Sequence, residues 1–342
     1  MSENILLLGA GGYIGSVLTD LLLKKKYKVS AYDRFFFGIE TLKKNITNKN
    51  LKIIKKDIRD IEANDFNKID HVIDLAALSN DPSCELDINL TKDINFHGRI
   101  KAARLASKNK VKKYIFSSTC SVYGDTKNNM VDETSKLSPI SEYAKSSAEC
   151  EKILLNELNN KDFCATIVRN GTVFGVSPRM RFDLVINLMT LTAFEKGKIY
   201  ILGGGNQYRP LIHVKDVCDC IIKILQAKND LVKNEIFNLG IGNKKISEIA
   251  FMIQSTLNKE IIIEKIEDDN DKRNYNVNFK KIKKKLKFFP KYSINFGIKE
   301  VYKSLKTKKV AKSQKTSTVE WYKFLINSKK IIDEVSINNK IF

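Results

Sequence analysis

The chain has 342 residues, of which 43% are hydrophobic and 29% are charged. This balance is typical of a globular protein and excludes an intrinsically disordered one. The first apolar run follows residues 1–4 without a basic segment before it, and no apolar span of about 18 residues is uninterrupted. We therefore expect no signal peptide, no membrane contact and a cytoplasmic location.

The net charge of +21 is uneven along the chain. Residues 271–342 hold 20 Lys and Arg against 5 Asp and Glu, most densely in the run at 280–285. A solvated surface, attraction of an anionic substrate, and contact with nucleic acid or a membrane are all consistent with such a run. Aromatic residues within 288–296 have spacings that suit a small core. We therefore favour a solvated surface and expect no nucleic-acid partner.

The six cysteines form no CxxC pair, and the chain has only three histidines. Cys218 and Cys220 are two residues apart, so on a helix they would point to different faces. We expect reduced, mostly buried thiols and no metal site.

The most specific pattern lies in the first 33 residues. An apolar run at 5–8 leads into the glycine-rich segment 9–15, a helical pattern and a second apolar strand that ends at Asp33. This order is typical of a strand–turn–helix–strand unit that binds a dinucleotide, in which the helix N-terminus faces the pyrophosphate. Asp33 lies where a carboxylate accepts both ribose hydroxyls of NAD and repels the 2′-phosphate of NADP, although Arg34 weakens that exclusion. The alternative is a glycine-rich turn without a ligand.

Strands and helices alternate through the first half of the chain. We expect strands at 51–54, 71–75, 113–117 and 164–169, and helices at 91–109 and 142–159. This spacing predicts an α/β fold with a Rossmann-type doubly wound parallel sheet. Ligands bind beyond the carboxyl ends of such strands, so the segments at 9–15, 76–81, 117–121 and 169–175 should line one cleft.

The pattern changes after Arg169. Loop-like segments at 171–178 and 203–210 flank a helix at 184–195 and a strand at 199–202. We predict an NAD-binding Rossmann domain at residues 1–168 and a mainly substrate-binding, smaller α+β portion at 169–342 with a basic C-terminal region. The segment at about 211–240 is expected to pack back on the first domain.

Several further motifs lie at the ends of these elements. They are Gly9/Gly12/Gly15, Asp33, Asp57-Ile58, Leu75-Ala76-Ala77, Ser117-Ser118-Thr119, Val122-Tyr123-Gly124, Tyr143-Ala144-Lys145-Ser146, and the segments at 209–216 and 271–275. Together they resemble the extended short-chain dehydrogenase/reductases, and more narrowly their NAD-dependent nucleotide-sugar epimerase/dehydratase branch. The resemblance covers most of the chain. It implies that a nucleotide-linked sugar loses a hydride to NAD while a tyrosine phenolate takes the hydroxyl proton.

The resemblance also implies site residues. Tyr143 is the expected base, and Thr119 is expected to hydrogen-bond the same sugar oxygen. Cofactor contacts are expected from Gly9, Gly12, Tyr13, Ile14, Gly15, Asp33, Arg34, Asp57, Ile58, Leu75, Ala76, Ala77, Asn95, Ser117 and Tyr143. Substrate contacts are expected from Ser79, Thr119, Asn170, Thr172, Arg179, Arg181, Arg209 and Arg273. The alternatives are that Thr119 caps a turn and that the arginines are surface residues.

Ser147 departs from the family pattern, which has lysine four residues after the tyrosine. That lysine holds the nicotinamide ribose and lowers the tyrosine pKa. A free tyrosine has a pKa of about 10, so about one in a thousand is ionised at pH 7, and serine supplies no charge. Lys145 is two residues from Tyr143 and does not share its helix face. Ser147 is thus the third catalytic position. With serine there, we expect either an active enzyme with a modified proton path or a protein that binds NAD and sugar nucleotide but turns over poorly.

Cys120 and Ser121 follow Thr119, where 4,6-dehydratases of the family carry an Asp-Glu pair for elimination. A dehydratase is therefore disfavoured. We predict NAD-dependent oxidation, reduction or epimerisation at a secondary hydroxyl, C4, of a nucleoside-diphosphate sugar, in carbohydrate biosynthesis. Family members commonly dimerise through two helices each, so we expect a homodimer through the helices at 91–109 and 142–159.

Overall fold

The computed structural model describes residues 2–158, 162–266, 273–338 and 340. The last residue of the predicted helix at 142–159 and the first two residues of the 271–275 motif lie outside these ranges. None of the helices in the described ranges combines the length and the hydropathy needed to span a membrane.

Seven parallel strands form the central sheet, in the order β11-β7-β5-β4-β1-β2-β3. The strands are β1 (Asn4–Leu8), β2 (Lys28–Asp33), β3 (Leu51–Lys55), β4 (His71–Asp74), β5 (Lys113–Thr119), β7 (Cys164–Asn170) and β11 (Glu235–Leu239). Successive side chains of β1 enter opposite cores, Ile5 and Leu7 on one face and Leu6 and Leu8 on the other. Helices cover both faces, so β1 is an apolar run without alternation. The predicted doubly wound α/β fold is confirmed.

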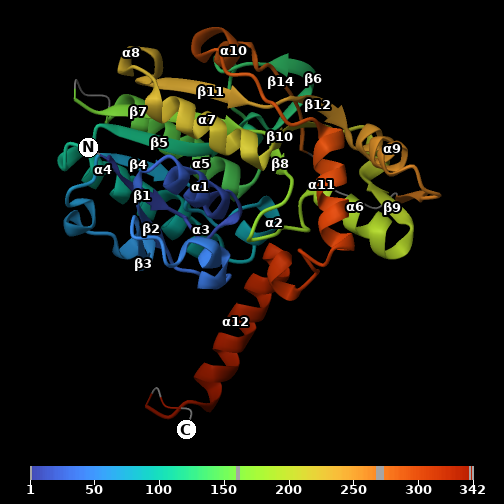
Figure 1. Ribbon diagram of the computed structural model, residues 1–342, viewed down its shortest axis with the longest axis horizontal. Coiled ribbons are helices and arrows are strands. Elements are labelled where there is room, and N and C mark those ends of the chain that lie inside the picture. The colour runs from blue at the N-terminus through green and yellow to red at the C-terminus, as the bar shows by residue number, and fades with distance from the viewer. Residues whose placement is uncertain (1, 159–161, 267–272, 339, 341–342) are drawn as a thin grey trace.

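Two layers of helices pack against the sheet (Figure 1). One core contains α1 (Tyr13–Lys24) and α7 (Val214–Gln226), and the other contains α4 (Arg99–Lys108) and α5 (Glu142–Asn156). The predicted helix at 91–109 is instead divided into α3 (Ile88–Lys92), a π turn at Asp93–Gly98, and α4. The π turn places Asn95 against the loop after β4, where its amide oxygen accepts from Leu78 N–H and its nitrogen donates to Leu78 O.

Residues beyond 169 contribute to both parts of the molecule. The helix α7 packs against α1, and β11 pairs in parallel with β7 at the sheet edge. In the three-stranded sheet, β10 (Tyr208–His213) lies between β12 (Gly242–Lys245) and β8 (Thr172–Phe174). In the two-stranded sheets, β13 (Ile262–Ile266) pairs with β9 (Lys198–Leu202), and β14 (Asn274–Val277) pairs with β6 (Asp125–Val131). The remaining helices are α2 (Asp81–Cys84), α6 (Val185–Lys196), α8 (Asn229–Val232), α9 (Ile246–Leu257), α10 (Lys280–Leu286) and α11 (Ile294–Lys306). The predicted domain boundary at residue 168 stays a prediction.

The lysine run forms the short helix α10. Ile282 and Leu286 turn inward to the core, whereas Lys281 and Lys285 both pair with Glu235 at the sheet edge. All six cysteines are free and buried. The last helix, α12 (Thr318–Val335), starts against the body and then extends away from it (Figure 1).

Glu300 on α11 ties the smaller part of the molecule to the segment that follows β8. Its carboxylate accepts from Val176 N–H at 3.0 Å and lies 3.1 Å from His213 Nε2 and 2.5 Å from Lys215 Nζ. Burial opposes the charge, but the hydrogen bonds from His213, Lys215 and Val176 lower the pKa of Glu300 to about 2 from an ordinary 4.5.

We expect Glu300→Gln to lower the free energy of unfolding by about 3 kcal/mol at pH 7. Because the pKa is lower in the folded chain than in the unfolded chain, the stabilisation is complete above about pH 4.5 and is lost as the pH falls toward 2. Urea unfolding of both proteins from pH 7 to pH 3 should show the difference shrinking. Glu320→Gln, at an exposed pair with Lys323, is the matched control. An equal difference at both ends of the pH range would contradict the prediction.

Candidate active site

The carboxyl ends of the central strands open into a cavity of about 760 Å³. Its wall includes the turn after β1, Asp33 at the end of β2, the loop after β4, and Thr119 at the end of β5. Every predicted site residue lines this cavity except Asn95 and Ser147. Asn95 hydrogen-bonds to Leu78 in the loop after β4, and Ser147 lies on the buried side of α5.

The glycine turn is shaped by close backbone approach. Gly9 has a φ of +81°, and a Cβ there would lie 2.8 Å from the backbone carbonyl of Leu75. A Cβ on Gly15 would overlap the carbonyl oxygen of Gly9. The helix α1 begins after Gly12 without a side-chain cap, which leaves its first N–H groups for a ligand. These features fit the pyrophosphate of a dinucleotide.

Asp33 is held by two backbone N–H groups. Its carboxylate accepts from Gly11 at 2.9 Å and from Phe35 at 2.6 Å. Burial raises the pKa of Asp33, and these hydrogen bonds oppose the rise. Arg34 pairs with Asp57 at 2.5 Å and not with Asp33, so Asp57 balances its charge.

Asp57 also accepts from both the backbone N–H and the guanidinium of Arg59. Against burial, these contacts and Arg34 hold the pKa of Asp57 well below its usual range. The carboxylate is therefore ionised and fixed at the edge of the cavity, beside Ile58.

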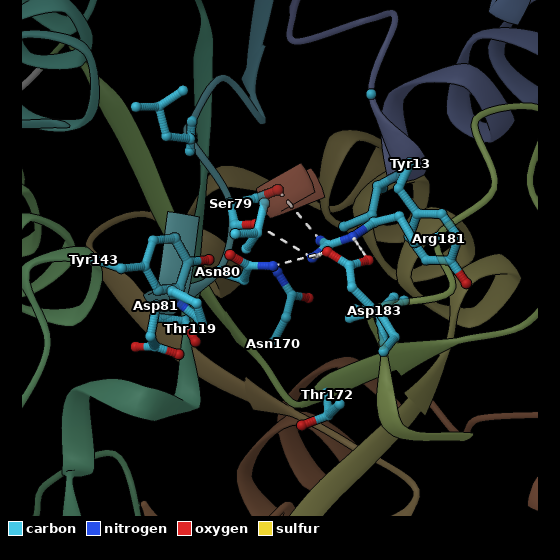
Figure 2. Close-up of a pocket in the computed structure, with 18 of the residues that line it drawn as sticks. Tyr13, Ser79, Asn80, Asp81, Thr119, Tyr143, Asn170, Thr172, Arg181 and Asp183 are labelled. Atoms are coloured by element: carbon cyan, nitrogen blue, oxygen red, sulfur yellow. Dashed lines mark hydrogen bonds and ion pairs between the residues drawn. The ribbon is translucent and has the colours of Figure 1, made fainter. Parts of the chain in front are cut away.

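Tyr143 and Thr119 lie together at one side of the cavity, with Asp81 beside them (Figure 2). Thr119 Oγ1 accepts from Ser121 N–H and lies 2.9 Å from Ser121 Oγ, so it caps a turn and also faces the cavity. Burial, and then the charge of Asp81, raises the pKa of Tyr143 to about 12. Cys120 is buried, and its thiol donates to Arg169 O at 3.3 Å.

Ser147 brings no charge to the reaction centre. Its hydroxyl donates to the carbonyl of Tyr143 at 3.0 Å, one helical turn back, and is not part of the cavity wall. Lys145 is exposed on the outer face of α5 and does not line the cavity. Lys145 therefore does not replace the missing lysine, in agreement with its two-residue spacing from Tyr143.

Three polar residues that were not named as site residues also line the cavity, and two of them belong to the segment at 76–81 that was expected there. Asp183 accepts from Arg181 at 2.9 and 3.0 Å, and Asn80 donates to Asp183 at 2.8 Å (Figure 2). Asp81 accepts from Ser141 Oγ and pairs with Arg273. Each lies within two residues of a predicted site residue, and the position of 80–81 in the loop that follows β4 could have indicated them.

The four arginines predicted to contact the substrate all reach the cavity but have different partners. Arg181 also donates to Ser79 Oγ at 3.2 Å. Arg179 lies over the ring of Phe37, 3.6 Å from its centroid. Arg209 donates to the carbonyl of Arg273, so these two residues from β10 and the start of β14 lie together. Arg179, Arg181 and Arg209 are buried, which contradicts the alternative of surface residues for them.

The chain is similar to proteins of one known family. The model of the NAD dependent epimerase/dehydratase family matches residues 5–240. A putative UDP-glucose 4-epimerase from Methanocaldococcus jannaschii is 28% identical over 312 residues, which cover 88% of this chain and 98% of that protein.

Two solved structures are also similar to the chain. A UDP-N-acetylglucosamine 4-epimerase from Methanobrevibacter ruminantium, in complex with UDP-N-acetylmuramic acid, is 25% identical with a TM-score of 0.81 and covers 90% of this chain and 100% of its own. A dTDP-glucose 4,6-dehydratase from Bacillus anthracis, in complex with NAD, is 25% identical with a TM-score of 0.78 and covers 90% of this chain and 98% of its own.

Across the described ranges, no group of three or more His, Cys, Asp or Glu side chains could hold a metal ion. The glycine turn, the uncapped helix start and Asp33 fit NAD instead. The family match spans well over half of the chain. The chain therefore belongs to the NAD-dependent epimerase/dehydratase family, the nucleotide-sugar branch of the extended short-chain dehydrogenase/reductases, and is an enzyme that uses NAD.

Proposed function

We propose that this enzyme oxidises, reduces or epimerises a nucleoside-diphosphate sugar at a secondary hydroxyl, the one on C4, with Tyr143 and Thr119 at the reacting oxygen. The observation that carries the proposal is that both residues share one cavity with the glycine turn and Asp33. The relatives named 4-epimerases support the C4 position. When bound, NAD supplies the hydride acceptor, and in an epimerase the donor that returns it.

Different residues are proposed to contact the sugar and the diphosphate of the substrate. Thr119 donates or accepts at the sugar oxygen, and Tyr143 takes or returns its proton. Arg209 and Arg273 line the cavity from β10 and from the start of β14, and their guanidinium groups suit the substrate diphosphate. Ser79, Asn170 and Thr172 also line the cavity and are proposed substrate contacts.

The proton step is the weakest part of the site. A tyrosine with a pKa of about 12 is ionised in about one molecule in 10⁵ at pH 7. Arg99 and Arg181 lower the pKa of Tyr143, but each is already paired with a carboxylate. This observation favours a second candidate function, a protein that binds NAD and sugar nucleotide with weakened turnover.

A dehydratase stays disfavoured. Burial raises the pKa of Cys120 far above neutral pH, so its thiol is a poor base. Ser121 is engaged with Thr119. The homodimer through α4 and α5, the cytoplasmic location and the role in carbohydrate biosynthesis also stay predictions.

The main test incubates the purified protein with a panel of UDP-, dTDP- and GDP-sugars and follows cofactor reduction and sugar products. We expect at least one sugar to be oxidised or epimerised. Tyr143→Phe should reduce turnover by about 100-fold or more because the proton acceptor is lost, with NAD binding unchanged. Tyr302→Phe on α11 is the matched control. Bound NAD without turnover of any panel member would favour the binding protein, and full turnover by Tyr143→Phe would reject Tyr143 as the proton acceptor.

Ser147→Lys tests the missing cation. An ammonium group near the phenol should lower the pKa of Tyr143, raise turnover near neutral pH by about tenfold or more, and shift the pH optimum downward. Ser255→Lys, at an exposed serine that also bonds back to its own helix, is the control. If neither turnover nor pH optimum moves, the enzyme uses another proton route. The measurement is a pH profile of kcat/KM.

Asp33→Asn tests the cofactor preference. Loss of the carboxylate weakens hydrogen bonds to the ribose hydroxyls, so the Kd for NAD should rise by about 10- to 100-fold. The Kd for NADP should change less because repulsion of its 2′-phosphate is also removed. Asp20→Asn on α1, at a surface pair with Lys24, should leave both values unchanged. Titration calorimetry gives the two constants, and an equal loss for both dinucleotides would reject the assigned role.

A further inference from the structure

Arg179 is a buried guanidinium with unused donors. It is 4% exposed, and it lines the cavity. Its Nη2 donates to Thr318 Oγ1 at 2.9 Å, and Phe37 covers one face of the group. Its Nε and Nη1 have no hydrogen-bond partner among the residues that the structure describes. A buried donor without a partner is costly, so these two atoms mark a position for an acceptor.

The charge of Arg179 is also unbalanced. Asp183, an acid within electrostatic range of Arg179, has both oxygens on Arg181, whose own charge repels Arg179. Burial lowers the pKa of Arg179 to about 10, so the group still carries its charge at neutral pH. Burying a cation that forms no salt bridge with a described residue is costly, and a bound anion would remove much of that cost.

The position of Arg179 indicates which anion this is. Phe37 belongs to the loop that follows Asp33, and the charge of Arg179 lowers the pKa of Asp33. The reaction centre, by contrast, is built from β5 and α5. Arg179 therefore belongs to the cofactor end of the cavity, where the diphosphate is the only anionic group of NAD.

The C-terminal segment at 316–322 connects the elements that form the cofactor end of the cavity. Trp321 Nε1 donates to Phe36 O at 2.7 Å, and the ring of Tyr322 lies 5.7 Å from that of Phe36. Thr318 N–H donates to Asp183 at 3.2 Å, and its hydroxyl accepts from Arg179. The first turns of α12 thus join the loop after β2 to the segment at 179–183, and Tyr322 itself lines the cavity.

We infer that Arg179 binds the diphosphate of NAD, and that the C-terminal segment at 316–322 positions Arg179 and closes the cofactor end of the cavity. This replaces the expectation that Arg179 contacts the substrate. The inference rests on the proposed placement of NAD against Asp33 and is independent of the reaction catalysed.

The test compares ligands that share or lack the cofactor diphosphate. Kd values for NAD, ADP-ribose, NADP and UDP are measured by calorimetry on wild type and Arg179→Gln. We expect the variant to bind NAD and ADP-ribose about tenfold or more weakly and UDP as well as wild type does. Loss for UDP alone would place Arg179 at the substrate, and a loss confined to NADP would place it at the ribose. Either result, or no change at all, would overturn the inference.

Two further variants test the C-terminal segment without removing a charge. Thr318→Val replaces the hydroxyl that holds Arg179 by a methyl group, and Trp321→Phe removes the donor to Phe36 while keeping an aromatic ring. Both should raise the dissociation rate of NAD several-fold and leave the Kd for UDP unchanged, a split that general destabilisation would not produce. If Arg179→Gln does not fold, these two variants still test the inference. Unchanged NAD dissociation in both would overturn the role of the segment.

Arg104→Gln is the matched control for the arginine substitution because Arg104 is exposed and pairs with Glu157 at the surface. It should alter none of the four constants. Failure of the proposed reaction is separate, since binding is measured without turnover. A protein that binds NAD through Arg179 but turns over no sugar would refute the reaction and support this inference.

Discussion

Pairing of buried charges under the carboxyl ends of the strands is the constraint on which this site depends. Asp74 at the end of β4 is fully buried, and Arg99 donates to it at 3.0 Å and to Ser117 O at 2.9 Å. One guanidinium thus joins the ends of β4 and β5, which hold the cavity loops. Arg169 and Glu151 form a second buried pair behind Thr119. Removing one partner of such a pair leaves a buried charge and is strongly destabilising.

The same constraint explains why Tyr143 is hard to ionise. Arg99 and Arg181 are within electrostatic range of its phenol, but Asp74 and Asp183 already balance their charges. Neither arginine can therefore act as the unpaired cation that the family's lysine supplies. The positive charge of oxidised nicotinamide is then the available source of stabilisation for a phenolate, which would link proton removal to the oxidised state of the cofactor.

Sequence patterns predicted those features that depend on neighbours in the chain. The strand ends, the glycine turn and Asp33 follow from local periodicity and spacing, and parallel topology brings them to one edge. The absence of lysine at 147 could also be read directly. The bonds from Asn80 to Asp183 and from Arg179 to Thr318 join residues 103 and 139 positions apart, so no local pattern indicates them. The π turn at Asn95 was missed because a continuous apolar period resembles one helix.

Closure of the cofactor end by the chain's own C-terminal segment bears on which reaction is the better proposal. In an epimerase, the hydride returns to the carbon that lost it, so each turnover restores NAD and no exchange is needed. A net oxidation leaves reduced cofactor, which must leave or be reoxidised in place before the next sugar reacts. If the C-terminal segment retains NAD as inferred, the contacts of Arg179 with Thr318 and of Trp321 with Phe36 would slow exchange in either case. Retention of NAD does not slow the turnover of an epimerase. For net oxidation, it makes the release of reduced cofactor an additional slow step. Within the proposed function, the architecture therefore favours the epimerase.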